Sequence, residues 1–191
     1  MLVYSLAPVS GGHINPAITF GLMLSRKVTL LRGVSYGVAQ CGGAVLGTLV
    51  AASLGHDTYR AAGGGVNGSA VFGVREVLTA EVVATSLLVL TVYAAVDPLR
   101  AGKVIHIGAL GPAAIGGAVF AAHLALIPID GTSINPARSL GPALVYGRWH
   151  QFWAFWVGPL VGAAAAAVVY ELVLKARPPK EEAQQGGKEC K

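Results

Sequence analysis

The stretch SGGHINPAITFG at residues 10–21 returns in altered form as DGTSINPARSLG at residues 130–141. Both stretches carry the tripeptide Asn-Pro-Ala at the same place, preceded by isoleucine and closed by glycine. Asparagine is a favourable N-cap, and proline is a favourable first helical residue. The sequence therefore predicts two short helices, over residues 14–23 and 136–145, each with the positive end of its dipole at the motif.

Most of the chain is apolar. Its 191 residues are 54% hydrophobic and 12% charged, with a mean hydropathy of +0.62. Four stretches, at residues 33–55, 77–96, 104–129 and 151–170, have the length and composition of helices of about 20 residues that cross a bilayer, and Glu81 is the one acid inside them. A buried soluble core explains one such stretch but not four, so the sequence predicts an all-α integral membrane protein.

The basic residues gather on one side of the predicted spans. The segments before the first span, between the second and third, and after the fourth hold ten of the fourteen lysines and arginines. By the positive-inside rule this side, with the C-terminus, is cytosolic. We expect a membrane domain over residues 1–175, a Gly-rich polar loop over 55–74 on the outer side, and a disordered tail over 176–191. Charges that flank spans argue against nucleic-acid binding.

The two cysteines, Cys41 in the first predicted span and Cys190 in the tail, have neither zinc nor redox spacing. The sequence also contains no recognisable nucleophile–base or metal-ligand set. It therefore gives no support to an enzyme, a metal site or a cofactor.

The repeat extends beyond the two motifs. Residues 39–44 of the first span match residues 158–163 of the last, at nearly the same distance from each motif. An odd number of spans separates the two units, so the units run in opposite directions through the membrane. Inverted repeats with discontinuous helices that meet at the midplane are typical of transport proteins.

Duplicated Asn-Pro-Ala motifs on inverted half-helices resemble the aquaporin (major intrinsic protein) family. Residues 10–31, Asp97-Pro98 followed by His106, and the stretch from His123 to the second motif are similar to the plant plasma-membrane intrinsic proteins. The resemblance implies an aquaporin-like inverted repeat of six spans and two re-entrant half-helices, in a homotetramer with one pore per subunit. On that pattern the sequence holds four spans and both half-helices, and lacks the first span and most of the second.

The resemblance also implies the pore motif, which consists of Asn15, Pro16, Ala17, Asn135, Pro136 and Ala137. Two amide groups that donate to one passing water would turn its hydrogens along the pore and interrupt a proton-conducting chain. The two positive helix ends would repel cations. The alternative is that both asparagines are N-caps without any contact to a solute.

Arg138 follows the second motif at membrane depth, where a charge is costly and a functional role is the default. The resemblance implies that Arg138 forms a selectivity filter of the water-selective type with His123 and Thr132. The fourth filter residue of the family would precede Met1. The alternative for His123 is a packing histidine.

Three residues are candidates for pore lining or gating. His13 is expected in the cytosolic vestibule, His106 resembles a loop histidine whose protonation closes the channel, and Thr29 stands where the family often has a phosphorylated serine. Glu81 is expected to be structural and to accept hydrogen bonds from backbone near a half-helix. The alternative for Glu81 is a proton relay.

The leading hypothesis is a passive water channel in the plasma membrane, a homotetramer or a hetero-oligomer with related subunits, whose partners are the lipid bilayer and water. One alternative is a facilitator of other small neutral solutes, such as hydrogen peroxide, carbon dioxide or glycerol. Another is a truncated, non-conducting partner of full-length subunits. We expect the chain alone to conduct poorly, because no full span precedes its first half-helix.

Overall fold

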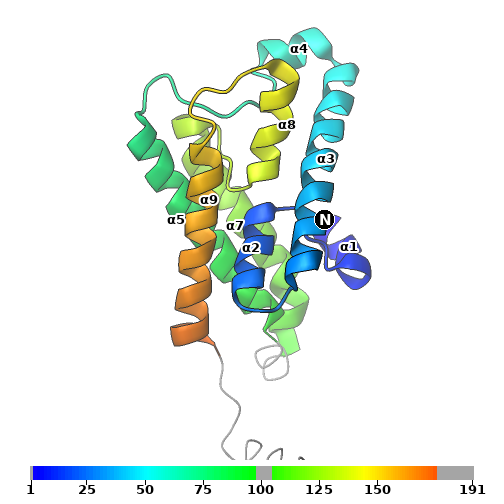
Figure 1. Cartoon of the computed structure of the whole chain (residues 1–191), viewed down its shortest axis with the longest axis vertical. Coiled ribbons are helices and arrows are strands. Elements are labelled where there is room, and N and C mark those ends of the chain that lie inside the picture. The colour runs from blue at the N-terminus through cyan, green and yellow to red at the C-terminus, as the bar shows by residue number, and fades with distance from the viewer. Residues whose placement is uncertain (1, 98–104, 176–191) are drawn as a thin grey trace, which may run out of the picture.

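The computed structural model describes residues 2–97 and 105–175, apart from the side chains of residue 56 and residues 105–109. The predicted tail at residues 176–191 therefore lies outside the described residues. Within the described ranges the chain is helical and has no strand (Figure 1). The elements are α1 (Leu2–Ser10), α2 (Pro16–Leu24), α3 (Leu30–Leu54), α4 (His56–Ala61), α5 (Val74–Val96), α7 (Ile105–Asp130), α8 (Pro136–Tyr146), α9 (Ala154–Val169) and a π-helical turn (Tyr170–Leu174).

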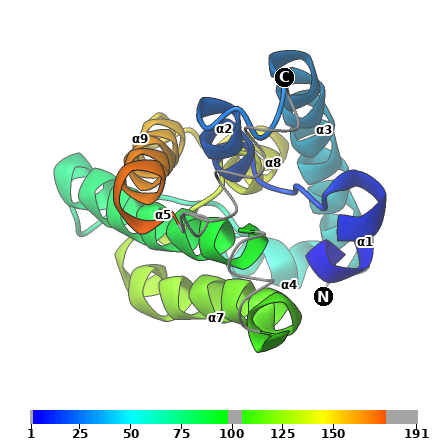
Figure 2. The ribbon, with the colours of Figure 1, turned by 90° about the horizontal axis from the view of Figure 1, so that it is seen from below.

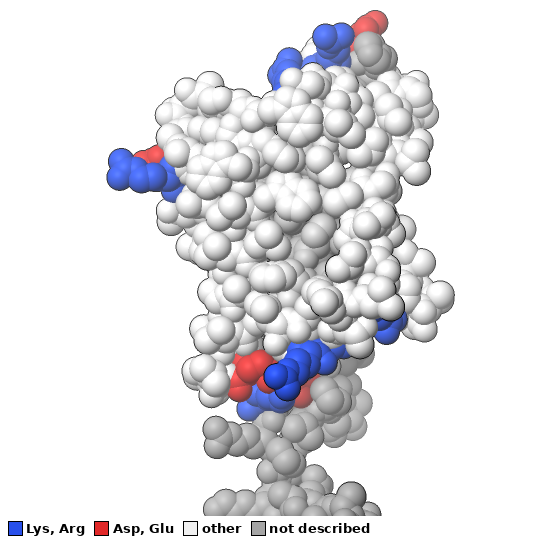
Figure 3. Space-filling view, viewed as in Figure 1, with Lys and Arg blue, Asp and Glu red and all other residues white. Residues whose placement is uncertain are grey.

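Four of the described helices are long and apolar enough to cross a membrane, which confirms the prediction of an all-α membrane protein. They cover Leu30–Leu54, Val74–Val96, Leu110–Asp130 and Ala154–Leu174. On the face shown in Figure 3, charged side chains gather towards the two ends and leave an uncharged band between them. This is the charge pattern expected of a protein whose middle lies in lipid.

The two short helices that follow the motifs are α2, of nine residues, and α8, of eleven. Such helices are about 14–17 Å long, half of what a bilayer crossing needs. Figure 1 shows α8 in the upper half of the molecule and α2 in the lower half, with their N-terminal ends towards the middle. Seen from below, the two half-helices lie between α3 on one side and α5 and α9 on the other (Figure 2).

Glycines let neighbouring helices approach each other closely. A Cβ added at Gly162 of α9 would lie 2.5 Å from the Val82 carbonyl oxygen of α5, and one added at Gly141 of α8 would lie 2.5 Å from the Ala44 carbonyl oxygen of α3. By contrast, a Cβ at Gly43 of α3 would have nothing within 4 Å. The corresponding faces of α9 and α3 thus differ, because α5 covers the first and no described residue covers the second.

A core of aromatic and small residues joins α2, α5 and α9 near the C-terminal end of α9. The rings of Tyr93 and Tyr170 stack with their centroids 5.0 Å apart. The Tyr93 hydroxyl donates to the Gly21 carbonyl at 2.6 Å, and the Tyr170 hydroxyl donates to Asp97 at 2.6 Å. The first bond therefore holds α2 to α5, and the second holds the turn after α9 to the end of α5.

Ion pairs lie at the same end of the molecule, beside the C-terminal end of α9. The Glu171 carboxylate lies 3.7 Å from the Lys27 ammonium and 2.6 Å from the Lys175 ammonium. Its hydrogen bond and negative charge raise the pKa of the exposed Lys175. Exposed pairs of this kind contribute little to stability, so the tyrosine core is the stronger link.

Two short helices differ from the sequence analysis. Residues 2–10, for which the sequence predicted no helix, form α1, which ends where Gly11 and Gly12 take the left-handed conformation. The loop predicted over residues 55–74 contains α4, with Asp57 in its first turn and Arg60 in its last. An acid in the first turn and a base in the last turn suit the helix dipole. A helix of six residues is too short to show a helical period of apolar residues in the sequence, so α4 was not predicted.

Candidate functional site

The first motif caps its own helix and also contacts the other repeat. The Asn15 side-chain oxygen accepts from the Ala17 N–H at 2.9 Å, which fixes the start of α2. The Asn15 amide nitrogen donates to the carbonyl oxygen of Ile134 at 2.8 Å, across 119 residues of sequence. Asn15 therefore binds the residue that directly precedes the second motif.

The second motif makes the equivalent contacts with the first repeat. The Asn135 side-chain oxygen accepts from the N–H groups of Ala137 at 3.1 Å and Arg138 at 3.3 Å, and its amide nitrogen donates to the Ile14 carbonyl at 3.0 Å. An amide NH2 group has two hydrogens, and these contacts use one from each asparagine. The two half-helix ends thus meet in a reciprocal pair, and each asparagine has a second hydrogen that the pair does not use.

Glu81 holds the turn before the second motif. This glutamate of α5 is fully buried, and its two carboxylate oxygens accept from the N–H groups of Ser133 and Ile134, each at 2.6 Å. Hydrogen bonds from the backbone to a charged group are short and strong. The acid inside the span is therefore compensated by the re-entrant backbone, and it fixes the carbonyl to which Asn15 donates.

Arg138, on the first turn of α8, is held by backbone and side-chain oxygens. Its Nη1 donates to the Gly65 carbonyl and, at 2.7 Å, to the Asn67 side-chain oxygen. Its Nη2 donates to the Gly131 carbonyl at 3.3 Å. Neither Gly65 nor Asn67 could be recognised from the sequence as a partner of Arg138. The one signal was the run of glycines at residues 63–65, each of which has positive φ.

Thr132 and His123 lie on either side of the end of α7. Thr132 is fully buried with φ +55°, and its N–H donates to the Asp130 carboxylate at 2.8 Å. His123 is half-buried, and its Nδ1 lies 2.8 Å from the Val119 carbonyl one turn earlier. Thr132 is next to Gly131, whose carbonyl binds Arg138, whereas His123 is about two helical turns before that point.

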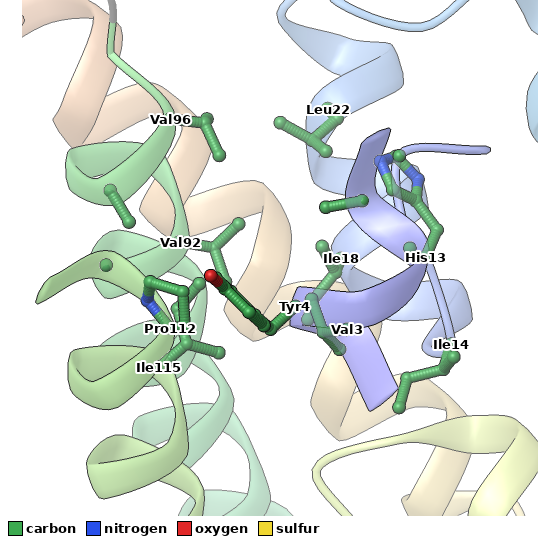
Figure 4. A pocket seen from close by; sticks show the side chains of 15 residues that line it. Val3, Tyr4, His13, Ile14, Ile18, Leu22, Val92, Val96, Pro112 and Ile115 are labelled. Carbon is green, nitrogen blue, oxygen red and sulfur yellow. The ribbon is translucent and has the colours of Figure 1, made fainter. Parts of the chain in front are cut away.

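Hollows lie beside the motif junction, which is the place where Asn15 and Asn135 each bind the backbone before the other motif. One of about 220 Å³ lies between α1, α2, α5 and α7, where Figure 4 shows Tyr4 reaching towards Val92 and Pro112. A second, of about 520 Å³, is bordered by α3 and α8 and reaches Asn135 and Arg138. His13 and Ile14 line both hollows, which therefore adjoin at the residues before the first motif.

Residues 1–170 match the model of the family described as "Major intrinsic protein". The chain belongs to the major intrinsic protein family. This family consists of membrane transport proteins and not of enzymes. The match confirms the resemblance on which the inverted-repeat fold was predicted.

Curated relatives of this major intrinsic protein are plant aquaporins. It is 54% identical to Aquaporin PIP1-6 of Zea mays over 186 residues, which cover 95% of this chain and 63% of the relative. It is 50% identical to Probable aquaporin PIP2-5 of Arabidopsis thaliana over 180 residues, which cover 92% of this chain and 63% of the relative. The chain thus spans about 63% of the length of these relatives.

A solved structure of an aquaglyceroporin has a similar fold. The X-ray structure of the aquaglyceroporin from Plasmodium falciparum matches with a TM-score of 0.76 and 26% sequence identity. The match covers 88% of this chain and 75% of that chain.

His13 of this major intrinsic protein is tied to both α2 and α3. Its Nδ1 lies 3.3 Å from the Thr19 hydroxyl, and its ring meets that of Tyr36 edge-on with centroids 5.1 Å apart. The Gln40 amide donates to the His13 carbonyl at 3.0 Å. Burial, and then the positive charge of Arg32, lower the pKa of His13. Both effects favour the neutral form of the ring.

The other two gating candidates lie at helix starts. Thr29 is exposed and caps α3, where its hydroxyl accepts from the Arg32 N–H at 3.4 Å. His106 is in the first turn of α7, but its side chain lies outside the described residues. The structure does not bring Thr29 into the motif junction.

Proposed function

We propose that this chain forms the pore of a passive water channel in the plasma membrane. The observation that carries the proposal is the reciprocal pair, in which Asn15 and Asn135 each cap one half-helix and bind the other. The second amide hydrogens would both donate to the oxygen of one water, whose own hydrogens then point along the pore. Neighbouring waters cannot pass a proton through a molecule held in this way.

Selectivity is proposed to depend on Arg138 together with His123 and Thr132. Carbonyl and amide oxygens accept the hydrogen bonds of the guanidinium, so no directly bonded carboxylate offsets its positive charge. A fixed positive charge repels cations, and the two helix N-termini at the junction act in the same direction. A histidine beside it would narrow the passage and favour water over larger solutes.

The names of the relatives support this choice of solute and membrane, because they describe plant aquaporins of the PIP type. A second candidate function is the passage of other small neutral solutes, such as hydrogen peroxide, carbon dioxide or glycerol, since the similar solved structure is an aquaglyceroporin. In the channel we propose a membrane domain over residues 1–175, a cytosolic C-terminus and a homotetramer or an assembly with related subunits. Glu81 would be structural in it.

Osmotic swelling of vesicles tests the proposal. One set would contain this chain, and a second would contain the chain joined to the part of the maize relative that it does not match. Water flux above that of protein-free vesicles in either set would support a channel, and flux in the second set alone would mean that this chain does not conduct by itself. The absence of excess water flux from both sets would overturn the water channel.

Widening the proposed filter should admit larger solutes. The conducting form is whichever of these two chains gives water flux. In it, we expect Arg138→Val and His123→Gly to raise glycerol uptake by about tenfold, since about 1.4 kcal/mol of discrimination against glycerol corresponds to that factor. Tracer uptake measures the effect, with Arg148→Val, an exposed arginine, as the control. Glycerol uptake that stays at the wild-type rate in both variants would remove these residues from the filter.

His106 should carry sensitivity to internal acid. It is the histidine at the predicted cytosolic end of the span over residues 104–129, and protonation would favour the closed form. Water flux of the conducting form should fall as internal pH drops from about 7.5 to about 6, the range of an ordinary histidine. The flux of His106→Ala should stay high, whereas His150→Ala at the other end should close like the wild type. Closure of His106→Ala would place the sensor elsewhere.

A further inference from the structure

Asn67 is buried although it belongs to the loop between α4 and α5. Only 6% of its surface is exposed, in a stretch where Gly63, Gly64 and Gly65 have positive φ. These glycines turn the chain inwards, so that the loop passes beside α8. A polar side chain buried in this way must find hydrogen-bond partners.

The partners of Asn67 come from both sides of the second motif. Its side-chain oxygen lies 2.7 Å from Nη1 of Arg138 and accepts its hydrogen bond, and the Ser139 hydroxyl lies at the same distance. Its amide nitrogen donates to the Asp130 carbonyl at 3.3 Å, and the N–H of the next residue, Gly68, donates to the same carbonyl at 2.9 Å. Asn67 therefore joins the start of α8 to the end of α7.

The contacts close into a ring. The Asp130 carboxylate accepts from the Thr132 N–H at 2.8 Å, and the Gly131 carbonyl between them accepts from Nη2 of Arg138 at 3.3 Å. One asparagine thus fixes the guanidinium through its oxygen and the turn that carries Thr132 through its nitrogen.

The chemistry of the amide suits this position. It offers an acceptor and a donor on one rigid group, and a hydrogen bond to a charged donor is stronger than one between neutral groups. An aspartate in its place would keep the acceptor but would offset the positive charge of Arg138. The neutral amide holds the guanidinium and leaves its charge in place.

We propose that Asn67 is a positioning residue that sets the location of Arg138 and of the Thr132 turn. The expected effect of this positioning is that larger solutes are excluded, and that effect rests on the proposed channel function. The loop before α5 would accordingly be part of the filter and not merely a connector.

The same residue begins an Asn-x-Ser pattern, Asn67-Gly68-Ser69, which fits an acceptor for N-linked sugar. A sugar on Asn67 would use the amide nitrogen that binds Asp130 and would require space that the buried side chain lacks. The folded chain therefore excludes the modification. An experiment has to separate the two roles, since replacing Asn67 removes both.

Ser69 provides the matched control. Its hydroxyl accepts from the N–H groups of Val71 and Phe72 within the loop, at 3.3 and 2.9 Å. Ser69→Ala removes the sugar acceptor pattern but keeps Asn67, whereas Asn67→Ala removes both. An effect shared by the two variants would point to a sugar or to loop stability and would overturn the proposal.

The reactivity of Arg138 towards phenylglyoxal tests the proposal without any need for conduction. In membranes that contain the full chain, the modification rate of Arg138 is followed by mass spectrometry, with the exposed Arg75 as the internal reference. We expect about a tenfold faster reaction of Arg138 in Asn67→Ala, because a hydrogen bond to a charged group restrains it, and a wild-type rate in Ser69→Ala. Equal Arg138 rates in all three chains would overturn the proposal, and a faster reaction at Arg75 as well would show general unfolding instead.

The conservative variant separates positioning from folding. Asn67→Asp keeps the acceptor, so Arg138 should react within about twofold of the wild-type rate. In whichever form conducts water, Asn67→Ala, which loses both the acceptor and the donor, should admit glycerol. If no form conducts water, the proposed function fails, but the reactivity of Arg138 still decides whether Asn67 holds it. Asn67→Asp that reacts as fast as Asn67→Ala would mean that the acceptor is not what restrains Arg138.

Discussion

Replacement of Glu81 by glutamine is expected to lower the free energy of unfolding by about 3 kcal/mol. The two carboxylate oxygens accept from two backbone N–H groups at 2.6 Å in a fully buried site. Glutamine has one acceptor oxygen, and its NH2 group would face the second N–H, so that a donor meets a donor. The turn that carries the Ile134 carbonyl would then shift away from Asn15. Unfolding in detergent by denaturant titration, followed by the helical circular dichroism signal, measures the change.

Glu76→Gln is the control for this prediction. Glu76 is an exposed acid in the first turn of the same helix, so its replacement should change the free energy of unfolding by less than about 0.5 kcal/mol. If Glu81→Gln unfolds at the same denaturant concentration as Glu76→Gln, the carboxylate does not hold the turn. A buried proton relay would be compatible with that result, whereas a structural role would not.

Gly162→Val should separate α9 from α5 and destabilise the chain by about 3 kcal/mol or more, because an added side chain there cannot be accommodated. A Cβ at Gly162 would lie 2.5 Å from the Val82 carbonyl and 3.1 Å from the Ser86 N–H, and backbone atoms cannot move aside as a flexible side chain can. Tyr170 would lose its stacking on Tyr93 as α9 moves. The same detergent titration measures the loss.

Gly43→Val is the matched variant in the other repeat. Gly43 corresponds in sequence to Gly162, but a Cβ there would have nothing within 4 Å. Both changes put valine for glycine inside a helix, so the difference between them isolates the packing. Gly43→Val should stay within about 1 kcal/mol of the wild type. A loss equal to that of Gly162→Val would mean that another element or another subunit covers this face of α3.

The sequence by itself identified the half-helices and the spans. The helix predicted over residues 14–23 is found at Pro16–Leu24, and the one over residues 136–145 is found at Pro136–Tyr146. Both starts follow from local chemistry, since an asparagine cap and a proline act on the next few residues. The four spans followed from apolar length alone. The small helices α1 and α4 were missed because their formation does not depend on a long apolar pattern.

The tertiary structure alone decided how the two halves hold each other. Asn15 donates to a carbonyl 119 positions away, Arg138 binds Asn67 across 71 positions, and Glu81 binds Ser133 across 52. Such contacts leave no periodic trace, because each depends on one pair of groups brought together by the packing of separate helices. A hydrogen bond is specified by the positions of two atoms, whereas a span or a cap is specified by neighbours in the chain. For this reason the motifs could be found in the sequence, and the ring around Arg138 could not.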